Sequence, residues 1–117
     1  MDNAGKYDLS FLNKISNGDQ DFILDMIQTF KKIAPVSIRK MKAFLEEKKY
    51  DSLSREAHRL IPGISFLGVK WIEDNLMKIE DYSKRMENIT QLQSLLLLAE
   101  EDINQLIFQF NKDFNLT

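Results

Sequence analysis

The sequence predicts an all-α fold, an antiparallel four-helix bundle with one short additional helix at its N-terminus. The chain of 117 residues contains only four glycines and two prolines, so few residues interrupt regular structure. Apolar residues make up 44% of the chain and recur at helical spacing along four long segments. No run of alternating β-branched residues is long enough to indicate a strand. We therefore treat residues 1–117 as one bundle domain.

The short first helix is predicted over residues 9–15, where Leu9, Leu12 and Ile15 share one side. The Asn17-Gly18 pair that follows is a typical turn signal and marks its end. We expect this helix to cover one end of the larger bundle like a lid.

The second helix is expected from Asp19 to about Lys49. Asp19 is a good N-cap, because its carboxylate can accept hydrogen bonds from the free backbone amides of the first turn. Pro35 lies inside this segment and removes one backbone hydrogen bond, which predicts a kink. We expect one kinked helix rather than two, because the helical spacing of apolar residues resumes beyond the proline. The residues of this apolar stripe are Phe22, Ile23, Met26, Ile27, Phe30, Ile33, Ile38, Met41, Phe44 and Leu45.

The third helix is predicted over about residues 51–66, with Asp51 or Ser52 as its N-cap and Gly68 as a stop signal. Pro62 allows two interpretations, since local rules favour an end after Leu60 and a turn at the proline. We expect a bent helix that continues, because the apolar stripe extends past the proline; its members are Leu53, Ala57, Leu60, Ile64 and Leu67.

Two further helices complete the predicted bundle. The fourth is expected from about Val69 to Met86, and it buries Ile72, Leu76 and Ile79. The last begins at Thr90, which stands in capping-box spacing with Gln93. Its apolar residues continue to Phe110: Leu92, Leu95, Leu96, Ala99, Ile103, Leu106 and Ile107.

Composition excludes several classes of function. The 16 basic and 18 acidic residues are interspersed, so no basic face predicts binding to nucleic acid or to an anionic membrane. With no cysteine and one histidine, no metal site is expected, and acidic pairs such as Glu80-Asp81 are interpreted as solvated faces. No apolar run approaches the roughly 20 residues that span a bilayer, and the opening MDNAGKYD lacks the apolar stretch of a secretory signal. We expect a cytoplasmic monomer whose partner is another protein.

The only histidine, His58, is expected on the outside of the third helix. With Leu53 at zero and about 100° per residue, His58 falls near 140°, away from the apolar stripe. Its predicted neighbours on this face are Ser54, Arg55, Arg59, Pro62 and Ser65. A neutral imidazole has one nitrogen lone pair that can attack phosphorus, and Arg55 and Arg59 could supply positive charge to a phosphoryl group. The alternative is an ordinary surface histidine.

The segment around this histidine resembles the signature of histidine phosphotransfer (HPt) domains, usually written A-H-x-L-K-G followed by small residues and a glycine. Here it reads Ala57-His58-Arg59-Leu60-Ile61-Pro62-Gly63-Ile64-Ser65-Phe66-Leu67-Gly68, with the alanine, histidine, leucine and final glycine in common. The resemblance extends over nearly the whole chain, from Tyr7-Asp8-Leu9-Ser10 through a Gly-Asp turn and a long helix containing Ala34-Pro35. Two positions depart from the signature, since the usual lysine is Ile61 and the next glycine is Pro62.

This resemblance implies a phosphorelay carrier without kinase or phosphatase activity of its own. His58 would accept a phosphoryl group from a phospho-aspartate of a receiver domain and pass it to another receiver. The implied partners are response-regulator receiver domains and a hybrid sensor histidine kinase, with Mg²⁺ bound only by the receiver. We expect Arg55 and Arg59 to support the phosphate, and the partner to dock over Ser54, Ile61, Pro62 and Ser65. The alternatives are a degenerate HPt-like adaptor that binds partners without phosphate, and an unrelated structural bundle.

Overall fold

The computed structural model describes residues 7–116. Residues 1–6 and Thr117 lie outside this range. Within it all regular structure is helical and there is no strand, so the prediction of an all-α fold is confirmed. The elements are α1 (Ser10–Ile15), α2 (Gln20–Glu46), α3 (Tyr50–Phe66), α4 (Lys70–Arg85), the 3₁₀ turn η1 (Ile89–Gln91) and α5 (Leu92–Asp113).

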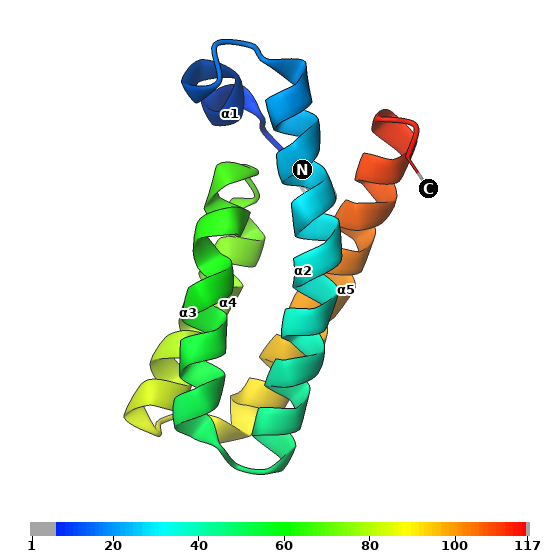
Figure 1. Cartoon of the computed structure of the whole chain (residues 1–117). Helices are drawn as coiled ribbons and strands as arrows, with labels where there is room; N and C mark the ends of the chain where they lie inside the picture. The colour runs from blue at the N-terminus through cyan, green and yellow to red at the C-terminus, as the bar shows by residue number, and fades with distance from the viewer. Residues whose placement is uncertain (1–6, 117) are drawn as a thin grey trace.

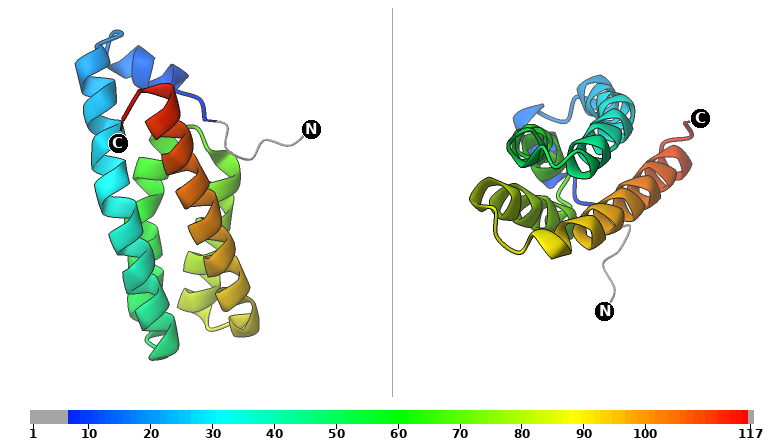
Figure 2. Two further views of the ribbon diagram at one scale, coloured as in Figure 1. Left: turned by 90° about the vertical axis from the view of Figure 1, so that its right-hand side faces the viewer. Right: turned by 90° about the horizontal axis from the view of Figure 1, so that it is seen from below.

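The four long helices form a bundle in which each packs against its neighbours in the chain (Figure 1). The packed pairs are α2 with α3, α3 with α4, α4 with α5, and α5 with α2, which closes the ring. Seen along the bundle in Figure 2, the helices surround a common interior. The connections are short, so consecutive helices run in opposite directions. No helix within residues 7–116 has the length and apolar character needed to cross a bilayer.

Helix α2 begins as predicted. The Asp19 side chain accepts hydrogen bonds from the backbone amides of Asp21 and Phe22, at 3.0 and 3.2 Å. The helix passes through Pro35 without ending, but it stops at Glu46, three residues early. Lys48 adopts a left-handed backbone (φ 58°), and the amide of Lys49 bonds back to the Phe44 carbonyl, which closes the helix.

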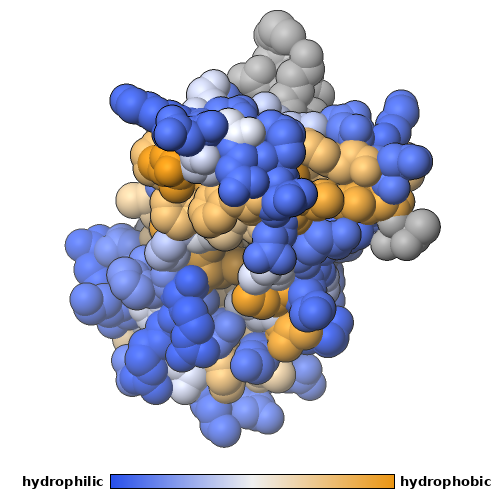
Figure 3. All heavy atoms as spheres, turned by 45° about the horizontal axis from the view of Figure 1, so that its top comes forward, coloured by the Kyte–Doolittle hydropathy of each residue, from blue (hydrophilic) through white to orange (hydrophobic). Residues whose placement is uncertain are grey.

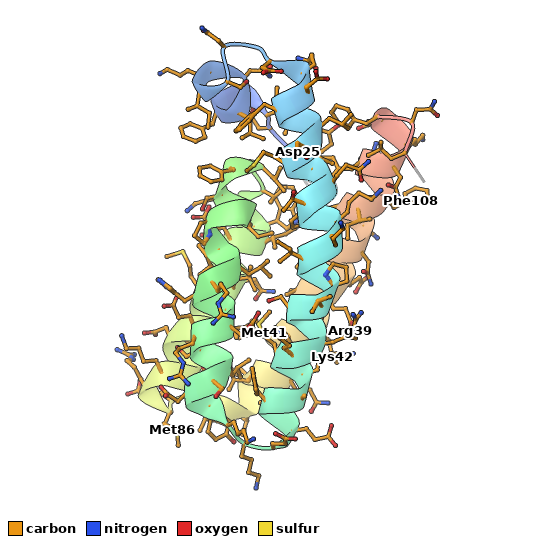
Figure 4. The ribbon with its side chains drawn as sticks, viewed as in Figure 1. Asp25, Arg39, Met41, Lys42, Met86 and Phe108 are labelled. Carbon is orange, nitrogen blue, oxygen red and sulfur yellow. The ribbon has the colours of Figure 1, made fainter. Side chains whose placement is uncertain are left out.

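The apolar stripe predicted for α2 is too wide. Ile33 is 52% exposed and Phe22 is also exposed, whereas Ile23, Ile27 and Phe30 are buried. The main packing partners of α2 are α3 and α5, so residues at the margins of its stripe remain in contact with solvent. In Figure 4, Met41 lies on the inner side of α2, while Phe108 of α5 and Met86 lie on the outside of the bundle.

Two predicted helix starts are wrong. Helix α3 begins at Tyr50, so neither Asp51 nor Ser52 is its N-cap, and Lys49 in that position offers no side-chain cap. Helix α5 begins at Leu92 without a side-chain cap, because Thr90 lies inside the η1 turn rather than at an N-cap. Pro62 does not end α3, which runs on to Phe66; the alternative end after Leu60 is therefore excluded.

At least one side-chain hydrogen bond from a buried residue joins each pair of consecutive long helices. Each involves a buried polar side chain on at least one helix, and such a bond helps to define which turns of the two helices face each other. The bonds are Ser37 Oγ to Glu56 Oε2 (2.7 Å), Ser54 Oγ to the Glu80 carbonyl (2.9 Å), and Asn75 Nδ2 to the Leu95 carbonyl (3.0 Å).

Helix α1 closes one end of the bundle, as expected, and buries Leu12 completely. The segment before it crosses the end of α3, where the Asp8 amide donates to the Leu67 carbonyl at 3.0 Å. Gly68 makes this crossing possible: its φ is +66°, and a Cβ there would lie 2.4 Å from the Asp8 carbonyl oxygen. The Phe11 ring stacks on Phe66 at a centroid distance of 5.6 Å.

Candidate functional site

His58 lies in the middle of α3 with 74% of its side chain exposed. Leu53, Ala57 and Leu60 on the opposite side of the same helix are buried in the core. The helical wheel accounts for this difference, because His58 points well away from the apolar stripe. The imidazole is thus held by a rigid, well-packed element and can be reached from solvent.

The nearest polar partner of His58 comes from the neighbouring helix. Oε2 of Glu80 in α4 lies 2.8 Å from His58 Nδ1. The Glu80 side chain is only 26% exposed, so this contact is sheltered by the two helices that form it. Because a carboxylate only accepts hydrogen bonds, Nδ1 is the protonated nitrogen of the neutral ring and Nε2 retains a lone pair.

Glu80 is a site residue that sequence reasoning missed, because it was interpreted as part of a solvated acidic pair. Glu80 and His58 are 22 positions apart, and no motif in the chain connects them. A local signal did exist, because Glu80 follows the core residue Ile79 and therefore lies at the margin of the α4 interface. To recognise Glu80 as a site residue, one would have to know which residues of α3 face which residues of α4.

Ser54 was expected to be exposed on the docking surface, but it is almost fully buried beside this pair. It is 5% exposed, and its hydroxyl donates to the backbone carbonyl of Glu80 at 2.9 Å. The expected exposure was wrong because Ser54 is adjacent to Leu53 and its hydroxyl faces α4. Its position is nevertheless informative: Ser54 fixes the backbone of the residue whose carboxylate binds His58.

Arg55 and Arg59 flank the histidine, but each guanidinium binds a carboxylate of its own helix. Arg55 pairs with Asp51, and both side chains are exposed. Arg59 binds Glu56 at 3.2 Å, and Glu56 is 8% exposed and also accepts the Ser37 hydroxyl. Within residues 7–116, no hydrogen bond joins either arginine to His58.

A shallow depression surrounds the exposed edge of the histidine. Its lining comes from α3 and α4 and consists of Asp51, Ser54, Arg55, His58, Arg59, Glu80 and Lys84. Lys84 is an addition that the sequence analysis did not include, and it lies one helical turn after Glu80. Among residues 7–116, no carboxylate comes within ion-pair distance of its ammonium group.

The other predicted docking residues lie along α3 beyond the histidine. Pro62 and Ser65 are exposed and Ile61 is half-buried, and the Ser65 hydroxyl donates to Glu73 at 2.8 Å. Phe66, the next residue after Ser65, stacks with the Phe11 ring of α1. Figure 3, which turns the α1 end toward the viewer, shows apolar patches among the charged side chains of this region.

Comparisons with known proteins do not assign a role to this site. No protein-family model, no curated protein and no solved structure matches the chain. No group of three or more histidine, aspartate or glutamate side chains within residues 7–116 is arranged to hold a metal ion. The function must therefore be argued from the geometry of the described residues.

Proposed function

We propose that this protein is a histidine phosphotransfer protein in which Nε2 of His58 carries the phosphoryl group. The observation that carries the proposal is the 2.8 Å contact between Glu80 and Nδ1 of an imidazole that is otherwise exposed. A hydrogen bond at one nitrogen orients the ring and leaves the other nitrogen as the nucleophile. Because the Glu80 side chain is only 26% exposed, it is held against α3 and favours one orientation of the ring.

The chemistry follows from this tautomer. The Nε2 lone pair attacks phosphorus in line with the bond to the donor aspartate, an N–P bond forms, and the P–O bond breaks with the carboxylate as leaving group. No proton has to leave Nε2, because the ring proton is on Nδ1. The ring of the product bears positive charge, and the Glu80 carboxylate stabilises that charge through the Nδ1–H hydrogen bond. Transfer to the next receiver reverses these steps.

The part of this chain in the proposed transfer is distinct from the parts that the resemblance to HPt domains implies for its partners. Its part is a positioned nucleophile on a rigid helix, and it has neither a nucleotide-binding motif nor a kinase signature. As the resemblance to HPt domains implies, we assign the Mg²⁺ and the phospho-aspartate to the receiver domain, and the phosphate supply to a hybrid sensor kinase. In this proposal the protein acts as a cytoplasmic monomer.

The second candidate function is an adaptor that binds receivers without taking up phosphate. Ile61 and Pro62 favour the adaptor function, because they place apolar surface beside His58. HPt domains, which this segment resembles, have a lysine and a glycine at these two positions. An adaptor would need the surface around Pro62 but not the imidazole. The two functions therefore differ in what His58→Ala does.

The test is phosphoryl transfer from a receiver domain charged with acetyl phosphate in the presence of Mg²⁺. We expect acid-labile, base-stable phosphate on the wild-type chain and none on His58→Ala, while both bind the receiver equally. Binding without labelling, with every receiver of the same cell, would reject the relay role in favour of the adaptor. Neither binding nor labelling would reject both.

A further inference from the structure

A phosphoryl group on His58 brings two negative charges next to the Glu80 carboxylate, so the site needs a cation that is free to approach it. Three cations line the depression around the histidine: Arg55, Arg59 and Lys84. The three cations differ in whether a carboxylate already pairs with them. The ion pairs of the site distinguish the three.

Arg59 is the least available. Its partner Glu56 is almost fully buried, and it depends on Arg59 and the Ser37 hydroxyl for its hydrogen bonds. Moving the guanidinium to a phosphoryl group would leave a buried carboxylate without its cation, which is costly. Arg59 therefore serves the interface between α2 and α3.

Arg55 is held less firmly, because its partner Asp51 is exposed and such pairs contribute little to stability. Its charge is nevertheless already balanced by that carboxylate within the same depression. An incoming phosphoryl group would compete with Asp51 for this arginine.

Lys84 has neither restriction. It belongs to the same helix as Glu80, one turn further on, so the two side chains share a face. The nearby carboxylates are otherwise engaged, since Asp81 of α4 and Glu87 just after this helix both pair with Arg85. Lys84 is the cation of the depression that no carboxylate of residues 7–116 neutralises.

We propose that Lys84 is the residue that binds the phosphoryl group on His58, so that α4 supplies both the carboxylate that orients the ring and the cation that holds the phosphate. This inference rests on the proposed function. It places the supporting charge on a different helix from the nucleophile.

Phosphoramidate, a small donor that phosphorylates histidine without a receiver, tests this directly. We expect Lys84→Gln to slow labelling of His58 about tenfold, as the loss of one charge-assisted hydrogen bond would do, and Lys84→Arg to retain most of the rate. Lys78→Gln removes the same charge from the same helix outside the depression, and it should change nothing. Arg55→Gln and Arg59→Gln should slow labelling less than Lys84→Gln, with circular dichroism to check folding.

A second readout is the ³¹P resonance of the phosphorylated chain followed against pH. Lys84 should favour the dianionic phosphoryl group, so the midpoint of its last ionisation should move to higher pH in Lys84→Gln and not in Lys78→Gln. If the wild type is labelled at His58 but Lys84→Gln matches it in both measurements, this inference fails and the proposed function stands. If the wild type takes up no phosphate from phosphoramidate or from any receiver, both fail.

Discussion

Glu80 contacts α3 at two points, through its carboxylate to His58 Nδ1 and through its backbone carbonyl to the Ser54 hydroxyl. Ser54 and His58 are four residues apart, so both contacts fall on adjacent turns of one helix face. Within α4, the Ser83 hydroxyl donates to the Ile79 carbonyl at 2.5 Å and lies 3.2 Å from the Glu80 carbonyl. The position of the ring relative to α4 is therefore set by backbone packing as well as by one side-chain contact.

Replacing Glu80 by glutamine should lower the rate of phosphoryl transfer about tenfold. The amide oxygen can still accept the Nδ1–H bond, but it no longer offsets the positive charge of the phosphorylated ring. The rate is measured with a charged receiver and with phosphoramidate. Asp74→Asn, which neutralises another carboxylate of α4 near its opposite end, is the control, and an equal loss in both variants would contradict a specific role for Glu80.

Ser54→Ala should destabilise the fold by about 1 kcal/mol, because the Glu80 carbonyl loses a buried donor. Chemical denaturation measures the free energy of unfolding. Ser94→Ala removes an exposed hydroxyl of α5 and should change stability by less than about 0.5 kcal/mol. A stability of Ser54→Ala equal to wild type would mean that this bond does not help to join α3 and α4.

The two glycines near the end of α3 should respond to alanine in opposite directions. Gly68→Ala should destabilise by more than about 1 kcal/mol, because its φ is positive and the new Cβ would collide with Asp8. Gly63 lies inside α3, and a Cβ added there would have no neighbour within 4 Å, so Gly63→Ala should stabilise by about 0.5–1 kcal/mol. Thermal unfolding of both variants checks the pair, and a Gly68→Ala variant as stable as wild type would contradict the crossing of Asp8 over Gly68.

Alkaline pH should weaken the attachment of the N-terminal segment. Burial, together with the hydrogen bond that Tyr7 donates to Asp113 at 2.5 Å, raises the pKa of Tyr7 above its ordinary value near 10. Since the pKa of Tyr7 is higher in the folded state than in the unfolded state, protonated Tyr7 stabilises the fold. This stabilisation is complete below about pH 10 and is lost as pH rises through the folded-state pKa.

Tyrosinate absorbance during an alkaline titration should therefore include a late ionisation that disappears in Tyr7→Phe. The variant should also lose the corresponding part of the pH dependence of unfolding. Ionisation of Tyr7 at the pH of a free tyrosine would show that the bond to Asp113 does not persist in solution.

The periodicity of apolar residues alone was enough to predict the helices of the bundle and the outward direction of His58. Both depend on residues within a few turns of one another, and the apolar stripes of α3 and α4 are unambiguous. The helix starts at residues 50 and 92 were missed, because left-handed residues such as Lys48 and Asn88 determine where the chain turns. Local capping rules could not show that these residues would adopt that backbone.

By itself, the sequence determined an all-helical chain with one histidine in the middle of an amphipathic helix. Only the tertiary structure decided what surrounds that histidine: it placed Glu80 and Lys84 beside it, buried Ser54, and engaged Arg59 with Glu56. The physical reason is that the partners of His58 belong to α4, more than twenty residues away along the chain. How these partners approach His58 depends on how the buried side chains of α3 and α4 pack against each other. No local pattern of residues specifies that packing.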